Sequence, residues 1–172
     1  MINNKKRISI IGGSGTGKTT LANKLGETLN LPVIHLDGIN YYDNWVERPK
    51  DERDKIILEK IQQDKWVIDG TYRSTLKQRL DRSDLIIYLD YSTWTQVKGV
   101  IFRRMKHIGK GNQERVEIKG CKEKLSIKFL VWVIQWRKTK RASILQTLNE
   151  YEHKSVLIFK NRRELNKWFE NL

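Results

Sequence analysis

The chain has 172 residues and a net charge of +14, because 34 Lys and Arg residues outnumber 20 Asp and Glu residues. This length suits one domain with a substantial buried core. The apolar runs are shorter than the roughly 18 residues of a membrane-spanning helix, and the basic N-terminus lacks the apolar region of a signal peptide. The single cysteine, Cys121, excludes an intramolecular disulfide and a cysteine-rich metal site. We therefore expect one domain over residues 1–172, located in the cytoplasm, with no membrane partner.

Short apolar runs alternate with segments of helical periodicity along the whole chain. The runs that predict strands are residues 7–11, 32–36, 66–69, 85–89 and 156–159. The segments that predict helices are residues 21–29, 49–63, 74–80, 94–105, 125–151 and 162–169. This alternation predicts an α/β fold in which helices cover both faces of a five-stranded parallel sheet.

A glycine-rich loop joins the first predicted strand to the first predicted helix. Residues 12–19 match the pattern G-x-x-x-x-G-K-[ST], and the strand before it and the helix after it give that pattern its structural context. Glycines let backbone N–H groups turn toward phosphate oxygens, and the helix N-terminus adds further donors. Lys18 can reach the β- and γ-phosphates of ATP, and the Thr19 hydroxyl can bind Mg²⁺. The residues that we expect to contact ATP are Gly12, Gly13, Ser14, Gly15, Thr16, Gly17, Lys18, Thr19 and Thr20.

An aspartate lies at or just after the end of the second, third and fourth predicted strands. The carboxyl ends of parallel strands share one edge of the sheet, so Asp37, Asp69 and Asp90 should gather around one crevice with the loop. We assign Asp69 to the metal, together with Thr19, and Asp37 to acceptor binding or general-base work. Asp90 is the alternative metal-side acid. Each aspartate could instead be a helix cap or an ordinary loop residue.

The acceptor side of the crevice is expected near Asp37 and Asp69. Tyr41, Tyr42 and Trp45 form an aromatic cluster that either stacks on a planar acceptor or packs in the core. Arg73 is placed to hold an anionic acceptor, Arg48 and Arg79 are weaker candidates, and His35 should point into the sheet or its edge. The residues that we expect to contact the acceptor are Asp37, Tyr41, Trp45, Asp69, Gly70 and Arg73.

A strongly basic region spans residues 98–141, with fourteen Lys or Arg residues and three Glu residues. Within it, residues 106–124 are polar and contain three glycines, which is typical of a lid that closes over a phosphoryl-transfer site. Arg103, Arg104 and Arg115 are the best candidates for stabilising the transferred group, followed by Arg137 and Arg141. The alternatives are a solvated helical face and a nucleic-acid surface.

The sequence resembles the FlaR-type DNA topology modulation proteins, which belong to the adenylate-kinase-like P-loop kinases. The segments that carry the resemblance are residues 12–19, 35–37, 45–47, 66–72, 103–104 and 119–121, the last of which precedes a Trp-rich helix. The resemblance implies the strand order 2-3-1-4-5, a lid and ATP binding. It also implies that Asp69, Gly70 and Arg73 belong to an acceptor-binding segment. Nucleotide kinases have an aromatic residue and a proline after the Asp-Gly pair, whereas this chain has Thr71 and Tyr72.

These features predict an ATP-dependent, Mg²⁺-requiring P-loop kinase-like phosphotransferase with a small-molecule, nucleoside- or nucleotide-like acceptor. Its catalytic residues would be Lys18, Asp37, Arg103, Arg104 and Arg115. The alternative is an ATP-regulated DNA-binding protein that influences DNA topology, with the basic region as its docking surface. Nucleic acid is the less favoured partner, and the sequence selects neither the acceptor nor an oligomeric state.

Overall fold

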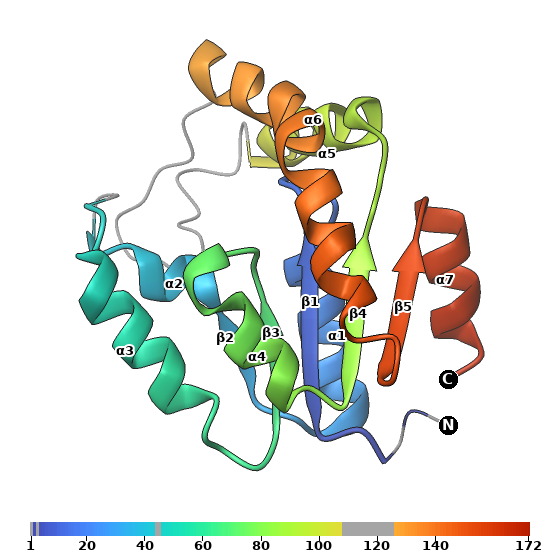
Figure 1. Ribbon diagram of the computed structural model, residues 1–172. Coiled ribbons are helices and arrows are strands. Elements are labelled where there is room, and N and C mark those ends of the chain that lie inside the picture. The colour runs from blue at the N-terminus through green and yellow to red at the C-terminus, as the bar shows by residue number, and fades with distance from the viewer. Residues whose placement is uncertain (1, 3, 44–45, 108–125) are drawn as a thin grey trace.

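Five parallel strands form the centre of the molecule in the order β2-β3-β1-β4-β5 (Figure 1). A computed structural model describes residues 2, 4–43, 46–107 and 126–172. The strands are β1 (Arg7–Gly12), β2 (Val33–His35), β3 (Trp66–Asp69), β4 (Leu85–Leu89) and β5 (Ser155–Phe159). Both the five-stranded parallel sheet expected from the apolar runs and the strand order implied by the resemblance are confirmed.

The described helices surround this sheet. They are α1 (Lys18–Leu29), α2 (Leu36–Asn40), α3 (Lys50–Lys60), the 3-10 helix η2 (Arg73–Thr75), α4 (Leu76–Arg82), α5 (Thr93–His107), α6 (Ile127–Asn149) and α7 (Arg162–Glu170). None of the helices in the described part of the chain combines the length and the apolar character needed to cross a bilayer. The expected lid at residues 106–124 begins at the last two residues of α5, and its remainder lies outside the described residues.

The sheet is buried on both faces because its central strands are almost wholly apolar. Every residue of β3 and β4 is buried, as a parallel sheet covered on both sides requires. On one face Ile10 and Ile87 pack with α1 and α7. On the other face Ile11 and Ile86 pack with α4 and α6, and Ile68 packs with α2 and α3. Alternate residues of each strand thus supply two cores.

Two expected boundaries are wrong in ways that affect the site. The second strand ends at His35, and the chain turns directly into α2, so that Asp37 lies in the first turn of a helix. A carboxylate is favourable there because the helix N-terminus carries partial positive charge. The helix expected over residues 49–63 is shorter, and Pro49 is its N-cap residue rather than its first helical residue.

Two other helices also differ from expectation. The helix expected over residues 74–80 is divided into η2 and α4. The long helix expected from residue 125 begins at Ile127, where the Ser126 hydroxyl accepts a hydrogen bond from the Phe129 amide at 3.1 Å. That contact satisfies one of the free N–H groups of the first turn and fixes the start of α6.

Helix α5 lies across the carboxyl edge of the sheet, above the loop that follows β1 (Figure 1). A Cβ atom on Gly99 would overlap the carbonyl oxygen of Gly15, and a Cβ atom on Gly15 would overlap the carbonyl oxygen of Gln96. The two backbones therefore touch without intervening side chains. This close backbone contact fixes the distance between α5 and the glycine-rich loop.

We expect Gly99→Ala to destabilise the protein, although alanine is normally the better helix former by about 1 kcal/mol. The added methyl group has to displace α5 or the Gly15 carbonyl, and overpacking of this kind costs about 1–3 kcal/mol. Chemical denaturation measures the change in the free energy of unfolding. Lys98→Ala, at an exposed neighbouring position, is the control and should change it by less than about 0.5 kcal/mol. A stabilised Gly99→Ala variant would contradict the close packing.

Candidate active site

The glycine-rich loop at residues 12–19 is called the phosphate loop below. Its backbone curls around, and two side chains of the loop bind the Gly13 carbonyl. Gly15 and Gly17 have φ angles of +77° and +91°, which side-chain-bearing residues rarely adopt. The Thr16 hydroxyl and the Lys18 ammonium group both donate to the Gly13 carbonyl, at 2.9 and 2.8 Å. Helix α1 begins at Lys18, so its free N–H groups face the loop. The loop thus has the shape and the donors of an anion-binding site.

Asp69 lies beside the phosphate loop and is bound from two sides. Its Oδ2 atom accepts a hydrogen bond from the Thr19 hydroxyl at 2.8 Å, and its Oδ1 atom lies 2.6 Å from His35 Nδ1. In the parallel register, His35 and Asp69 are paired at the carboxyl ends of β2 and β3. The strand order therefore brings together the two residues that we assigned to the metal and a histidine that we had expected in the sheet or at its edge.

These oxygen atoms suit Mg²⁺ by their chemistry. A hydroxyl group and a carboxylate lie next to a phosphate-binding loop, and Mg²⁺ commonly uses one or two carboxylates together with substrate phosphates and water. Within the described residues, no group of three or more His, Cys, Asp or Glu side chains could hold a metal ion. The donor set thus fits a nucleotide-bound Mg²⁺ better than a metal bound by protein ligands alone.

Asp37 is bound by a tyrosine that follows β3, and this tyrosine in turn contacts α3. The Tyr72 hydroxyl donates to Asp37 Oδ1 at 3.0 Å. Burial, the charge of Asp37 and this hydrogen bond together raise the pKa of Tyr72 far above its ordinary value, so that the phenol stays protonated and donates. The Arg53 guanidinium of α3 lies 5.1 Å from the centre of the Tyr72 ring and donates to Asn40 Oδ1. Sequence reasoning gave Tyr72 no contact with Asp37, and it missed Arg53 because residues 50–60 contain no motif.

Thr71 links the acceptor side to the phosphate loop. Its hydroxyl accepts a hydrogen bond from the Gly12 amide at 3.0 Å and donates one to the Gly12 carbonyl at 2.9 Å. Gly12 ends β1 and begins the loop, and a Cβ atom there would lie 3.0 Å from the Leu89 carbonyl oxygen. The residue that departs from the nucleotide-kinase pattern therefore binds both backbone groups of the first loop residue.

Arg79 is not the acceptor ligand that we had considered. Its side chain is fully buried and donates to the carbonyl oxygens of Gly70 and Tyr72, at 3.0 and 2.8 Å. Burial lowers its pKa to about 10, against the opposing charge of Asp69. Arg79 instead holds the backbone that carries Thr71.

The other acceptor candidates are spread over a wider area. Arg73 is exposed and donates to the Ser143 hydroxyl of α6 at 2.9 Å. Arg48 is bound to Glu52 and lies 4.1 Å from the centre of the Tyr42 ring. Tyr41 pairs with Glu47 through an antiparallel bridge, and Trp45 lies outside the described residues. The described part of the expected aromatic cluster thus includes an exposed tyrosine, Tyr42, covered on one side by an arginine.

Asp90 forms an ion pair that makes it unsuitable as the metal-side acid. Arg141 of α6 donates from Nε to both carboxylate oxygens at 2.9 Å, and Arg137 Nη2 lies 3.5 Å from Oδ1. The Asp90 side chain is only 3% exposed. A buried carboxylate between two arginines is neutralised by them, and it anchors α6 to the carboxyl end of β4.

Two of the three expected lid arginines lie on α5. Gly99 and Val100 contact the phosphate loop, and Arg103 and Arg104 follow one turn later, so they extend the same face of the helix. Both side chains are half-buried. Arg115 lies outside the described residues. The helix that touches the loop backbone therefore also carries two cations toward it.

The whole chain is similar in structure to two solved shikimate kinases. The one from Acinetobacter baumannii, in complex with shikimate, is 17% identical, has a TM-score of 0.58, and the match covers 98% of this chain and 92% of that one. The one from Bacteroides thetaiotaomicron is 19% identical, with a TM-score of 0.56 and coverage of 96% and 99%. No protein-family model and no curated protein matches the chain. At this identity the likeness shows the fold, which is the P-loop kinase fold.

We expect Thr71→Val to weaken nucleotide binding, because it removes both hydrogen bonds to Gly12 at nearly constant volume. Two lost hydrogen bonds of about 0.5–1.5 kcal/mol each destabilise the loop conformation by about 1–3 kcal/mol, which raises the Kd for ATP by at most a roughly 5- to 160-fold factor. Isothermal titration with a non-hydrolysable ATP analogue measures it. Thr71→Ser keeps the hydroxyl group and should bind like the parent protein. Equal affinities for the two variants would remove Thr71 from this role.

Proposed function

We propose that this protein is an ATP- and Mg²⁺-dependent phosphotransferase that acts on a small-molecule acceptor bearing a hydroxyl group. One observation carries the proposal: the phosphate loop, the Thr19–Asp69 pair and Asp37 lie along the same edge of the sheet. A donor loop alone is common to all P-loop proteins. Besides Asp69 on the metal side, Asp37 adds a second carboxylate, which can accept the proton of an acceptor hydroxyl group.

On the ATP side of the site, backbone N–H groups and one lysine would bind the phosphates. In our proposal the N–H groups of residues 12–19 bind the β- and γ-phosphates, and Lys18 exchanges the Gly13 carbonyl for phosphate oxygens. Arg103 and Arg104 add positive charge from α5, where charge develops on the transferred group. Arg115 and the lid over residues 106–124 belong to the same proposal.

Thr19 and Asp69 would bind Mg²⁺. Bound Mg²⁺ would neutralise charge on the phosphates. Thr19 supplies its hydroxyl, Asp69 supplies its carboxylate through the water shell of the metal, and His35 keeps the carboxylate oriented from its other oxygen.

The acceptor lies, in this proposal, between Asp37 and the residues that follow β3. Asp37 accepts or orients the hydroxyl proton, while Tyr72 holds the carboxylate in place. Arg73 and Tyr41 remain acceptor candidates, with Trp45 and Gly70. The acceptor class includes nucleosides, nucleotides and other small polyols. Shikimate, named for a protein of the same fold, is one compound to test.

Three wider predictions from the sequence stay predictions. They are the membership of the FlaR-type proteins, the single domain over residues 1–172 and the cytoplasmic location. The strand order agrees with the order that the FlaR resemblance implied, and this agreement bears on the first of them alone.

We expect that ATP consumption rises with one acceptor from a panel of nucleosides, nucleotides and hydroxylated metabolites. Lys18→Ala should lower the stimulated rate by about 10²-fold or more, because the lysine stabilises the transferred phosphoryl group. Asp37→Asn should lower kcat and leave the Kd of ATP unchanged. Lys24→Ala, an exposed lysine on the same helix, is the matched control. The proposal fails if DNA, and no small acceptor, raises turnover above the Lys18→Ala background.

We expect Asp69→Asn to raise the Mg²⁺ concentration needed for tight nucleotide binding by about 10- to 100-fold. The amide keeps the size of the side chain but loses the charge that attracts the cation. A fluorescent ATP analogue titrated with and without Mg²⁺ measures this directly, and the Mg²⁺-free affinity is the internal control. If the dependence of nucleotide binding on Mg²⁺ is unchanged, Asp69 does not contribute to the metal site.

A further inference from the structure

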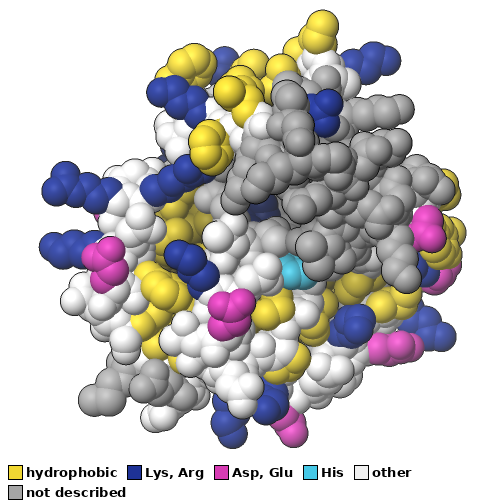
Figure 2. All heavy atoms as spheres, turned by 180° about the vertical axis from the view of Figure 1, so that it is seen from behind, with side chains coloured by type: hydrophobic (Ala, Val, Ile, Leu, Met, Phe, Trp, Pro, Cys, Tyr) yellow, Lys and Arg dark blue, Asp and Glu magenta, His cyan; other side chains and the backbone are white. Residues whose placement is uncertain are grey.

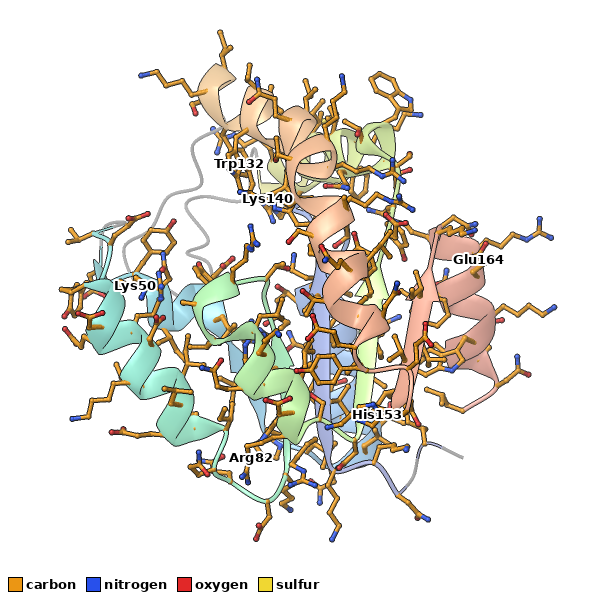
Figure 3. All side chains as sticks on the ribbon, viewed as in Figure 1. Lys50, Arg82, Trp132, Lys140, His153 and Glu164 are labelled. Atoms are coloured by element: carbon orange, nitrogen blue, oxygen red, sulfur yellow. The ribbon has the colours of Figure 1, made fainter. Side chains whose placement is uncertain are left out.

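Most exposed apolar side chains gather on two helices. Eight of the twelve large hydrophobic residues that are exposed in the described part of the chain lie on α5 and α6. They are Trp94, Ile101, Phe102, Met105, Ile127, Val131, Trp132 and Ile134. Figure 2 shows hydrophobic and cationic side chains interleaved at the end of the molecule where these helices lie, and Figure 3 places Trp132 there. Exposed patches of this kind mark interaction sites.

On α5 the exposed apolar residues form one stripe. Trp94, Ile101, Phe102 and Met105 fall within one face at the helical spacing of 100° per residue. Phe102 and Trp94 are each 66% exposed. The opposite face carries Gly99 and the buried Val100 against the phosphate loop. Helix α5 is therefore apolar on its outer side as well as on its packed side.

Helix α6 repeats this arrangement in its first half. Ile127, Val131 and Ile134 recur at spacings of four and three residues and are 82%, 44% and 45% exposed. Val133 and Trp136, on the other side of the helix, are buried. Trp132 is exposed but lies outside the outer stripe, and its ring stacks on Phe129 at 5.7 Å. Within the described residues, the contact of α6 with the sheet is made by inner residues such as Trp136.

The charge on these helices has one sign. Neither Thr93–His107 nor Ile127–Asn149 contains an Asp or Glu residue. Exposed lysines lie within the stripes: Lys98 Nζ is 5.2 Å from the centre of the Trp94 ring, and Lys138 continues the spacing of Ile127 and Ile134. The matching partner is therefore anionic and also accepts aliphatic groups.

Other occupants fit less well. A second copy of the chain would place two acid-free cationic faces against each other, and like charges repel. Single-stranded nucleic acid would stack on the tryptophans but has no place for Ile127, Val131 and Ile134.

We propose that the outer face of α5 and α6 docks on the surface of an anionic lipid bilayer. Trp and Phe side chains enter the interface between headgroups and acyl chains, as the apolar faces of interfacial helices do, while the lysines remain at the level of the anionic headgroups. This surface is separate from the phosphate loop and requires no nucleotide.

The test is co-sedimentation of the full chain with vesicles of phosphatidylcholine alone or with added phosphatidylglycerol. We expect binding to the anionic vesicles that weakens with salt. The Trp94→Ser/Phe102→Ser variant should bind about tenfold more weakly or worse. The Lys98→Gln/Lys138→Gln variant should also lose about tenfold, and only on anionic vesicles. Val46→Ser/Ile158→Ser changes two exposed apolar residues elsewhere and is the matched control.

Several outcomes overturn the proposal. They are no sedimentation with either vesicle, equal loss in the control variant, and binding that ignores lipid charge. A dimer in sedimentation velocity that Trp94→Ser/Phe102→Ser dissociates would assign the face to a second copy. Salt-dependent binding of single-stranded DNA, lost in the same variant while vesicles are not bound, would assign it to nucleic acid. Circular dichroism of each variant confirms that the comparison is between folded proteins.

Discussion

The phosphate loop is held in shape by neighbours that leave no room for side chains at Gly12, Gly13 and Gly15, and the rest of the site depends on this packing. A Cβ atom on Gly13 would overlap the Gln96 side chain and lie 3.0 Å from Trp136, and Gly15 touches the backbone of α5. Thr71 holds Gly12 from the third side. Elements that are distant in the sequence thus determine the conformation of eight residues. Because the loop lies at the end of the central strand β1, whatever holds it also fixes its distance from the other strand ends.

The strand-end aspartates have different partners, and those partners divide the chemistry among them. Asp90 is neutralised by two arginines and therefore serves the attachment of α6. Asp69 meets a hydroxyl group and an imidazole rather than an arginine. Asp37 meets a phenol that remains protonated. Three similar residues at similar places in the sequence thus have different partners, which come from different elements of the fold.

The periodic apolar runs were sufficient to predict the sheet, because central strands in a parallel sheet are buried on both faces and leave a clear pattern in the sequence. The loop and Asp69 could be predicted for the same reason, since a strand end fixes where they lie. The partners of Asp90 could not be predicted, because Arg141 comes from a helix 51 residues later and only tertiary packing selects it. The contact between His35 and Asp69 could have been predicted, because the register pairs these residues once β2 and β3 are placed side by side. Thr71 carried no such signal, because a hydroxyl group that binds a backbone looks like any loop residue.

Helix α5 connects the site to the surface that we propose for lipid. Its inner face touches the phosphate loop at Gly15, and its outer face carries the exposed Trp94 and Phe102. A bilayer on that outer face would lie beside the carboxyl edge of the sheet, where the candidate active site is, and not beside the opposite edge. The +14 charge of the chain would then serve two purposes at one end of the molecule. Half-buried arginines of α5 would face the phosphates, and exposed lysines of both helices would face the anionic headgroups. This division follows from the helical period, because residues three or four apart share a face and residues two apart do not.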